Sequence, residues 1–273
     1  MRPLLKGRGP HRVSGGEGIF FKNQNKLKIK REFSPAVFIG DFMIKAVFID
    51  IDGTLLDFEA CVEESMRVGL TENGTEYKPE MLETFHRINN GLWRDLEQGK
   101  LTFERLLEIR WATIFEALGI DLNGPEFEKY FRARLHKSAI PMAGSYEMLE
   151  YLSGKYRLFA ASNGPHEQQV ERLRKADMLK YFEEVFTSGK IGAEKPSADF
   201  FAYCFEKAGD IKPEESVMLG DSLTSDMKGG NDFGMETVWL NLNGKEAPEW
   251  LDHEIKSLDE IKNIIKNKTP CPY

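Results

Sequence analysis

Two carboxylates, Asp50 and Asp52, lie two residues apart at the end of a short apolar run and are followed by Gly53. Because side chains alternate along an extended chain, both carboxylates are expected on the same side of it. Paired carboxylates suit a hard metal ion or acid/base chemistry. The same residue types also end ordinary strands, since Asp and Gly are common in turns. On its own, the pair leaves a functional and a structural interpretation equally open.

Other polar residues follow later apolar runs in the same way. Ser162 and Asn163 end one run, Asp221 ends another, and Lys195 lies between them in the sequence. Each has a simple structural explanation, as a helix cap, a turn residue or a solvated lysine. Ligands of open α/β sheets, however, bind outside the carboxyl ends of the strands, which is where all of these residues are expected. Taken together and in this order, they favour one site.

The elements that must position these residues alternate between short apolar runs and longer amphipathic stretches. This alternation is typical of an α/β domain with a parallel sheet and helices on both faces, a Rossmann-like core. The clearest helices are expected at His166–Leu179 and Ser197–Ala208. Near-continuous apolar runs, typical of buried parallel strands, predict five strands at Lys45–Asp50, Arg157–Ser162, Glu184–Thr187, Ser216–Gly220 and Glu236–Leu240.

A long insertion, residues 57–140, separates the first two predicted strands and contains no strand pattern of its own. Apolar residues at helical spacing, such as Phe85 and Trp111, predict four helices with breaks at Gly99 and Gly119. An insertion of this size needs its own small core. We therefore expect a helical cap domain at 57–140 and a core domain formed by 43–56 and 141–265.

The first 42 residues differ in charge from the rest of the chain. They carry nine Lys and Arg against three Asp and Glu, a net charge of +6, whereas the remainder carries −13. The segment is also rich in Gly and Asn and lacks helical periodicity, as disordered segments do. We expect residues 1–42 to be disordered or a non-native extension, with Met43 opening the natural protein, and residues 266–273 to form a tail.

Composition excludes several classes of partner and site. No run approaches the roughly 20 apolar residues of a membrane span, and the acidic remainder has no basic cluster with interleaved aromatics for nucleic acid. Three cysteines, Cys61, Cys204 and Cys271, are spaced too far apart for a Cys-x-x-Cys or zinc motif. We expect a cytoplasmic protein that binds neither membrane nor nucleic acid. No Walker-type phosphate loop is present, and Gly53 comes too early for an EF-hand.

The ordered motifs resemble those of the haloacid dehalogenase superfamily. The family pattern is Asp-x-Asp-Gly-Thr, then Ser or Thr, then Lys-Pro, then Gly-Asp-x-x-x-x-Asp. This chain carries the four motifs as Asp50 to Thr54, Ser162, Lys195-Pro196, and Gly220 to Asp226. The match extends from about Met43 to Ile265, and the helical insertion is similar to the family's C1-type cap.

The resemblance implies a magnesium-dependent phosphatase in which Asp50 is the nucleophile and Asp52 the general acid and base. Asp50, the backbone carbonyl of Asp52, and Asp221 would hold Mg²⁺, with Asp226 in support. The phosphate would be bound by Ser162, Asn163 and Lys195. These roles agree with electrostatics, because a carboxylate can attack an anionic phosphate ester only if the repulsion between them is cancelled. Asp52 also argues for a phosphatase or phosphomutase over a dehalogenase, in which the resemblance implies that this residue is replaced.

A finer similarity concerns the noncanonical pyrimidine nucleotidases. It rests on Asn90 to Gly99 in the insertion, Ser162 to Val170, and Ser225 to Asn231 with Val238 to Asn241. The chain departs from that pattern at Gly53 and at Asp232-Phe233. The similarity implies a small phosphomonoester substrate, a nucleoside 5'-monophosphate. Phe85, Trp93 and Trp111 could offer a flat surface to its base.

Several alternatives stay open. The substrate could be a sugar phosphate or phosphoglycolate, the enzyme could be a phosphomutase, and a fold of this type can also serve as a catalytically silent binding protein. The sequence gives no prediction of the oligomeric state.

Overall fold

The structure of the protein, a computed structural model, describes residues 43–266. The expectations for residues 1–42 and, apart from residue 266, for the 266–273 tail lie outside the described residues. None of the helices within 43–266 is long and apolar enough to cross a membrane.

A parallel sheet of six strands forms the centre of the core, with the order β3-β2-β1-β4-β5-β6. This confirms the predicted α/β class and the five predicted strands. The sixth strand was missed, because a three-residue edge strand of sequence His-Glu-Ile has no apolar run. The strands are β1 Ala46–Ile49, β2 Arg157–Ser162, β3 Glu184–Thr187, β4 Ser216–Gly220, β5 Glu236–Leu240 and β6 His253–Ile255.

Strand β1 is central, and its register brings the predicted site residues together. Ile49 pairs with Ala160 of β2 and with Leu219 of β4. The carboxyl ends of these three strands therefore lie side by side, at one edge of the sheet. All four residues of β1 are buried, as expected for a strand covered on both faces.

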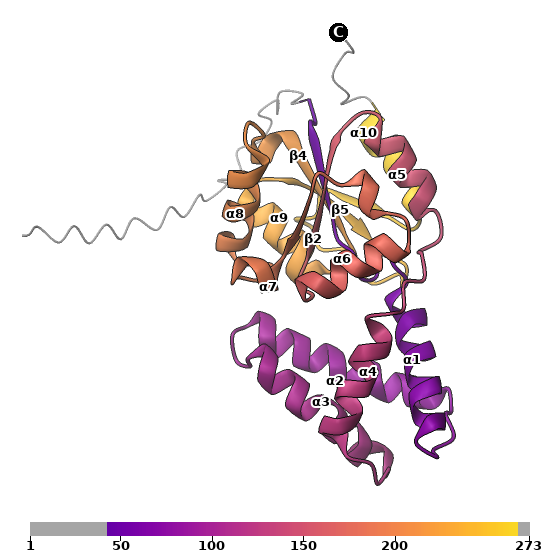
Figure 1. Cartoon of the computed structure of the whole chain (residues 1–273). Coiled ribbons are helices and arrows are strands. Elements are labelled where there is room, and N and C mark those ends of the chain that lie inside the picture. Colours follow the sequence, from indigo (N-terminus) through magenta and orange to yellow (C-terminus); the bar gives the residue numbers. More distant parts are fainter. Residues whose placement is uncertain (1–42, 267–273) are drawn as a thin grey trace, which may run out of the picture. The chain divides into compact units, whose positions relative to one another are not determined.

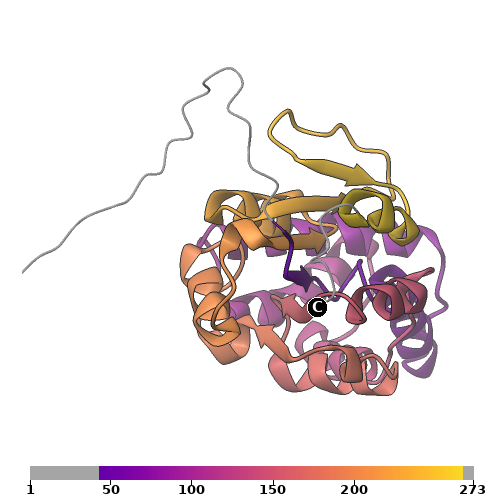
Figure 2. The same cartoon turned by 90° about the horizontal axis from the view of Figure 1, so that it is seen from above.

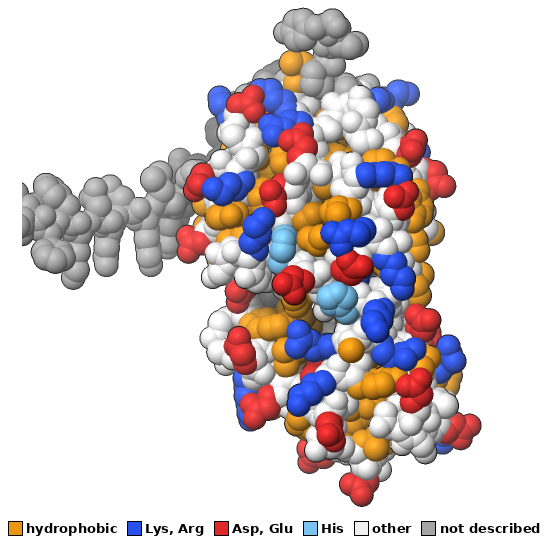
Figure 3. All heavy atoms as spheres, in the orientation of Figure 1, with side chains coloured by type: hydrophobic (Ala, Val, Ile, Leu, Met, Phe, Trp, Pro, Cys, Tyr) orange, Lys and Arg blue, Asp and Glu red, His pale blue; other side chains and the backbone are white. Residues whose placement is uncertain are grey.

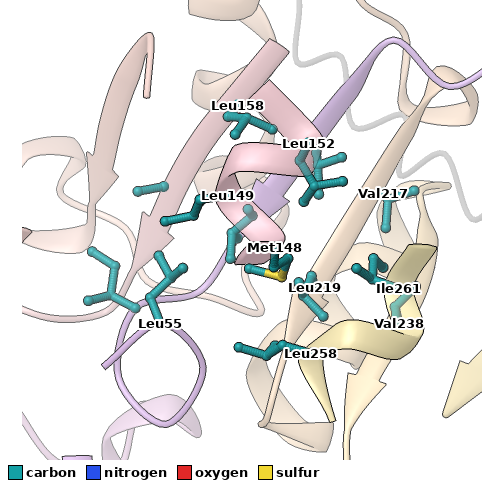
Figure 4. Close-up of a cluster of buried hydrophobic side chains, with 14 of the residues drawn as sticks. Leu55, Met148, Leu149, Leu152, Leu158, Val217, Leu219, Val238, Leu258 and Ile261 are labelled. Carbon is teal, nitrogen blue, oxygen red and sulfur yellow. The ribbon is translucent and has the colours of Figure 1, made fainter. Parts of the chain in front are cut away.

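Helices cover both faces of the sheet (Figures 1 and 2). One face packs against α5, α6 and α10, where Met148, Leu149 and Leu152 of α5 point at Leu219 and its neighbours (Figure 4). The other face packs against α8 through Phe200 and Phe201 and against α9 through Phe233. The core helices are α5 Ser145–Ser153, α6 His166–Lys175, α7 Ser188–Ile191, α8 Ala198–Ala208, α9 Lys228–Phe233 and α10 Ile261–Ile265, with short helical turns at Leu179–Tyr181, Pro213–Glu215, Leu223–Met227 and Leu258–Glu260.

Helix α6 is shorter than the sequence predicted. It ends at Lys175 instead of Leu179, because Asp177 adopts a φ of 54°, in the left-handed region that interrupts a right-handed helix. The prediction of a helix at Ser197–Ala208 is confirmed within one residue by α8.

The insertion folds into the four predicted helices, α1 Phe58–Glu72, α2 Glu80–Glu97, α3 Phe103–Leu118 and α4 Gly124–Leu135. Three of them begin at side chains that accept hydrogen bonds from the first turn, namely Asp57, Thr102 and Asn123. Gly119 ends α3 in the left-handed conformation.

The insertion has a buried apolar cluster separate from the two clusters of the core, built around Phe85, Trp111 and Phe131. The two chain segments that join it to the core run beside each other, since the Asp57 amide donates to the Ile140 carbonyl at 2.8 Å. We therefore propose that residues 57–140 form a cap with its own core, connected to the sheet domain by two adjacent linkers.

Candidate active site

Three carboxylates converge at the carboxyl edge of the sheet. Asp50 follows β1, Asp221 follows β4, and Asp226 lies in the helical turn after Asp221. One oxygen from each lies within 4.8 Å of the others. Such a group of hard oxygen donors is suited to a divalent cation such as Mg²⁺. The structure thus brings together three acids that are up to 176 positions apart in the sequence.

Lys195 neutralises part of this charge from within the protein. Its side chain is buried, and the ammonium donates to Asp50 Oδ1 at 2.7 Å, Asp226 Oδ1 at 2.6 Å and the Ala161 carbonyl at 2.6 Å. An ammonium has three N–H groups, so all of them are engaged. Its predicted contact with substrate phosphate stays a prediction, and a phosphate oxygen would have to share or replace one of these acceptors.

The electrostatics of the cluster follow from this burial. Loss of hydration raises the pKa of Asp50 well above its usual range; Lys195 opposes the shift, and the charges of Asp226 and Asp221 add to it. Part of Asp221 is exposed to the cavity, yet the protein around its carboxylate reduces hydration and, together with the charge of Asp226, raises its pKa to about 7. Burial opposes charge on Lys195, but Asp226 and Asp50 raise the pKa of its ammonium overall.

Close packing of the backbone permits this convergence. Gly53 adopts a φ of 85°, and a Cβ there would lie 2.6 Å from Asp221 Oδ2. The Asp221 loop is fixed from the other side by Trp239, whose indole N–H donates to the Asp221 carbonyl at 2.8 Å. Residues Leu223–Met227 form a π-helical turn. This turn directs Asp226 back toward the sheet, where its Oδ2 accepts from the Ser222 amide at 3.1 Å.

Ser162 and Asn163 occupy the end of β2, as predicted, but their side chains have different surroundings. Ser162 Oγ accepts from the Gly164 amide at 3.0 Å and from Gln169 Nε2 at 2.8 Å, which leaves its O–H proton available to donate. Asn163 instead clamps the Lys195 backbone, donating to its carbonyl at 2.9 Å and accepting from its amide at 2.8 Å. The Asn163 side chain thus positions Lys195, and the contact expected between its backbone N–H and phosphate stays a prediction.

Asp52 lies beside the cluster without joining it. Its two carboxylate oxygens accept from different side chains of α6: Oδ1 from Arg172 Nη1, and Oδ2 from Gln169 Nε2 at 2.5 Å. The guanidinium of Arg172 is fully buried, and its Nε donates to the Ser138 carbonyl in the linker that returns from the insertion, at 2.9 Å. Arg172 therefore connects Asp52 with that linker.

Sequence reasoning missed Arg172, although a signal was present. Gln169, Arg172 and Leu173 are the buried residues of α6 and lie three and four positions apart, on one helix face. A charged residue on the inward face of a helix needs a buried partner. The pattern thus indicated that Arg172 has a counter-ion but not that this counter-ion is Asp52.

A cavity of about 240 Å³ lies above the carboxylates and is lined by both the sheet edge and the helices of the insertion. Trp93 lines it, as the sequence suggested, together with Phe103, Asn89 and Arg132. Phe85 and Trp111 are fully buried in the cluster of the insertion and do not line it. On the face shown in Figure 3, basic and acidic side chains are interspersed.

Residues 44–234 match the family described as haloacid dehalogenase-like hydrolase. The chain belongs to this family. The matched region includes Asp50, Lys195 and Asp226, so the buried cluster at the sheet edge lies inside the region that defines haloacid dehalogenase-like hydrolases.

Individual relatives of this family are similar over most of their length. The pyrimidine 5'-nucleotidase PynA of Streptococcus pneumoniae is 31% identical over 233 residues, which cover 82% of this chain and 98% of PynA. The N-acylneuraminate-9-phosphatase of Homo sapiens is 29% identical over 219 residues, 76% of this chain and 86% of that enzyme. The crystal structure of the magnesium-bound HAD-hydrolase YfnB of Bacillus subtilis superimposes with a TM-score of 0.78 at 28% identity, covering 82% of this chain and 99% of YfnB.

Proposed function

We propose that this hydrolase is a magnesium-dependent phosphatase that cleaves small phosphomonoesters through an aspartyl phosphate on Asp50, and that its preferred substrates are pyrimidine nucleoside 5'-monophosphates. The observation that carries the chemical part is the buried contact of Lys195 with Asp50 and Asp226 beneath a cavity. A carboxylate beside an ammonium and further acids is suited to receive a phosphoryl group, because its own charge is held and partly balanced before substrate binds.

The donor set at the sheet edge fits Mg²⁺. Asp50 and Asp221 would hold the ion together with the Asp52 backbone carbonyl. Asp226 would act indirectly, by accepting a hydrogen bond from Lys195 and so holding this ammonium in place. Carboxylate and carbonyl oxygens are the ligands that Mg²⁺ prefers. When bound, Mg²⁺ supplies positive charge that offsets the repulsion between Asp50 and the phosphate. The YfnB relative that carries magnesium supports this assignment.

The residues of the chain divide the reaction into two steps. Asp50 attacks phosphorus while Asp52 gives a proton to the oxygen of the leaving alcohol, and an aspartyl phosphate remains on Asp50. Asp52 then takes a proton from water, which attacks phosphorus and releases inorganic phosphate. Ser162 can donate its O–H proton to a phosphate oxygen. Because Arg172 and Gln169 hold both oxygens of Asp52, these two residues would set the direction in which Asp52 exchanges its proton.

The pyrimidine preference is supported by PynA, which is 31% identical to this chain, and by the aromatic side chain of Trp93 in the cavity wall. The cavity of about 240 Å³ lies below the usual range of roughly 300–1,000 Å³ for ligand sites. A compact substrate suits it better than a long one. The flat aromatic surface lies in the same cavity as Ser162 and Lys195, which are predicted to bind phosphate. This arrangement fits a base joined to a phosphate.

The test is phosphate release in the presence of Mg²⁺ from UMP, dTMP, phosphoglycolate, hexose phosphates and an aryl phosphate. We expect the highest kcat/KM for UMP and dTMP, with weaker activity on the others, because such pockets discriminate by only a few kcal/mol. Higher kcat/KM for phosphoglycolate or the hexose phosphates would reject the nucleotidase assignment and retain the phosphatase. Transfer of phosphate between positions of one sugar would indicate a mutase. If phosphate were released from none of these esters, the remaining alternative would be a catalytically silent binding protein.

A further inference from the structure

The wall of the cavity formed by the insertion contains a buried polar network. Arg110 and Glu128 are each about 4% exposed, and the guanidinium donates to both carboxylate oxygens, from Nε at 3.0 Å and from Nη2 at 2.5 Å. The remaining guanidinium nitrogen, Nη1, donates to Asn89 Oδ1 at 3.1 Å. Asn89 is 2% exposed, and both Asn89 and Arg110 line the cavity.

This network fixes the orientation of the Asn89 side chain. Oxygen and nitrogen of a carboxamide are hard to tell apart by shape, so their assignment must come from the partner. Arginine has five N–H donors and no acceptor, and therefore only the oxygen of Asn89 can face Arg110. Arg110 in turn cannot rotate, because Glu128 holds it through two parallel hydrogen bonds.

The amide nitrogen of Asn89 is consequently directed away from the network. Within residues 43–266, no side chain or backbone group accepts a hydrogen bond from it, and it is not among the described polar atoms that are sealed from solvent. Because Asn89 lines the cavity, its N–H groups are available to a ligand there. A buried ion pair costs desolvation that an apolar pair would avoid. A fixed hydrogen-bond donor is a function that could account for retaining it.

Aromatic side chains complete this wall. The rings of Trp93 and Phe103 lie 5.9 Å apart, and the guanidinium of Arg132 lies 5.9 Å from the Phe103 ring centre. All three residues line the cavity. Arg132 carries only hydrogen-bond donors, and the group of Asn89 that has no partner in the network is its amide N–H₂. The wall therefore combines flat apolar surface with hydrogen-bond donors, and a matching ligand is a flat ring that carries carbonyl acceptors.

We propose that Asn89 is a specificity-determining residue that donates a hydrogen bond from its amide to a ring carbonyl of the substrate's base. Arg110 and Glu128 are positioning residues that act through Asn89. Uracil and thymine carry two ring carbonyls and cytosine carries one, whereas adenine carries none. This inference rests on the proposed function, since it names the group in the insertion that recognises the base.

The experiment compares UMP with ribose 5-phosphate, which has the same sugar and phosphate but no base. Asn89→Ala is expected to lower kcat/KM for UMP by about tenfold to a hundredfold, the usual cost of a lost hydrogen bond in a desolvated site. For ribose 5-phosphate the change should stay within about twofold. The readout is the ratio of the two values, because damage to folding or to the phosphate site lowers both together.

Two further variants separate recognition from packing. Asn89→Asp can still accept from Arg110 but no longer donates, so it should lower the ratio as Asn89→Ala does. Glu128→Gln keeps one hydrogen bond to Arg110 and should lower the ratio less, with the melting temperature recorded as a check on the fold. Arg87 lies on the same helix, is exposed and does not line the cavity. Arg87→Ala is therefore the control and should leave the ratio nearly unchanged.

The outcomes distinguish this inference from the proposed function. If the unmodified enzyme has the same kcat/KM for ribose 5-phosphate as for UMP, the proposed preference for a base is wrong. If it prefers UMP and the Asn89 variants lower both substrates equally, the base preference stands and the role of Asn89 is rejected. A larger effect of Arg87→Ala than of Asn89→Ala on the ratio would also overturn the proposal.

Discussion

At the scale of single residues, the site depends on charges that are buried together. Lys195 has 2% of its side chain exposed and lies between Asp50 and Asp226. The sequence predicted that these residues share one edge of the sheet, because strand ends meet there. It did not predict that the ammonium donates to both acids, since hydrogen-bond partners of this kind depend on side-chain packing that no local pattern records.

Replacement of Lys195 by Met should destabilise the protein measured without Mg²⁺. It leaves three neighbouring carboxylates without their cation, and breaking a buried ion pair typically costs about 3–5 kcal/mol. Urea unfolding measures the loss. The matched control is Lys228→Met, which removes an exposed pair with Asp232 and should cost less than about 1 kcal/mol. Equal losses in the two variants would show that Lys195 is not the counter-ion of the cluster.

Magnesium binding should weaken as the pH falls. The pKa of Asp221 is raised to about 7 and that of Asp50 is raised as well, so below about pH 7 protons occupy carboxylates that the ion needs. For one displaced proton, the apparent Kd should rise about tenfold for each pH unit below that value and level off above it. Calorimetric titration with Mg²⁺ on both sides of neutrality measures this. An apparent Kd that is unchanged across the range would contradict the assignment of Asp221.

At the scale of elements, α6 has a role that its sequence only partly indicated. The sequence predicted a helix starting at His166, but the position of Arg172 on its inward face was not used in that prediction. Arg172 and Asp52 are 120 positions apart. Local patterns cannot pair residues at such a separation, and the pairing depends on how α6 packs against the loop after β1. For the same reason the sequence did not show that Asn163 holds the Lys195 backbone.

Arg172→Met should lower kcat for UMP by about 100-fold or more, because Asp52 would lose the contact that orients it for proton transfer. For an aryl phosphate, whose leaving group departs without a proton, the first step should be slowed much less, and the initial release of phenol measures it; later turnovers still need Asp52 as a base. Arg174→Met on the same helix removes only an exposed pair with Glu171 and serves as the control. If Arg172→Met slowed the first release of the leaving group by the same factor for both substrates, Arg172 would support the structure without positioning Asp52.

At the scale of the whole molecule, the sheet with its covering helices and the helical insertion each contain buried apolar clusters of their own. In the proposed reaction the sheet edge supplies the carboxylates, and the insertion supplies the opposite wall of the cavity. The four helices of the insertion and five of the six strands could be predicted, because their apolar periodicity is strong. The sequence could not predict which of Phe85, Trp93 and Trp111 faces the cavity, because all three lie at helical spacing. Packing in the folded insertion buries Phe85 and Trp111 and leaves Trp93 in the cavity wall.

Trp93→Ala should therefore separate binding from chemistry. Removing the ring should raise KM for UMP by about tenfold through lost contact with the base, while turnover of an aryl phosphate at saturation stays within about twofold. Steady-state kinetics with both substrates measure the split. A drop in kcat for both, with KM unchanged, would mean that Trp93 acts on the reaction at the sheet edge and not on the base.

The central claim is that Asp50 receives the phosphoryl group. Its most direct test is the reaction of Asp52→Asn with an aryl phosphate and Mg²⁺, followed by acid quenching and mass spectrometry of peptides. A good leaving group allows the first step without an acid, whereas the second step still needs a base. We expect a rapid release of about one equivalent of phenol, slow turnover, and a phosphoryl group on the peptide that contains Asp50. Phosphorylation of a different residue, or normal turnover by Asp50→Asn, would contradict the account.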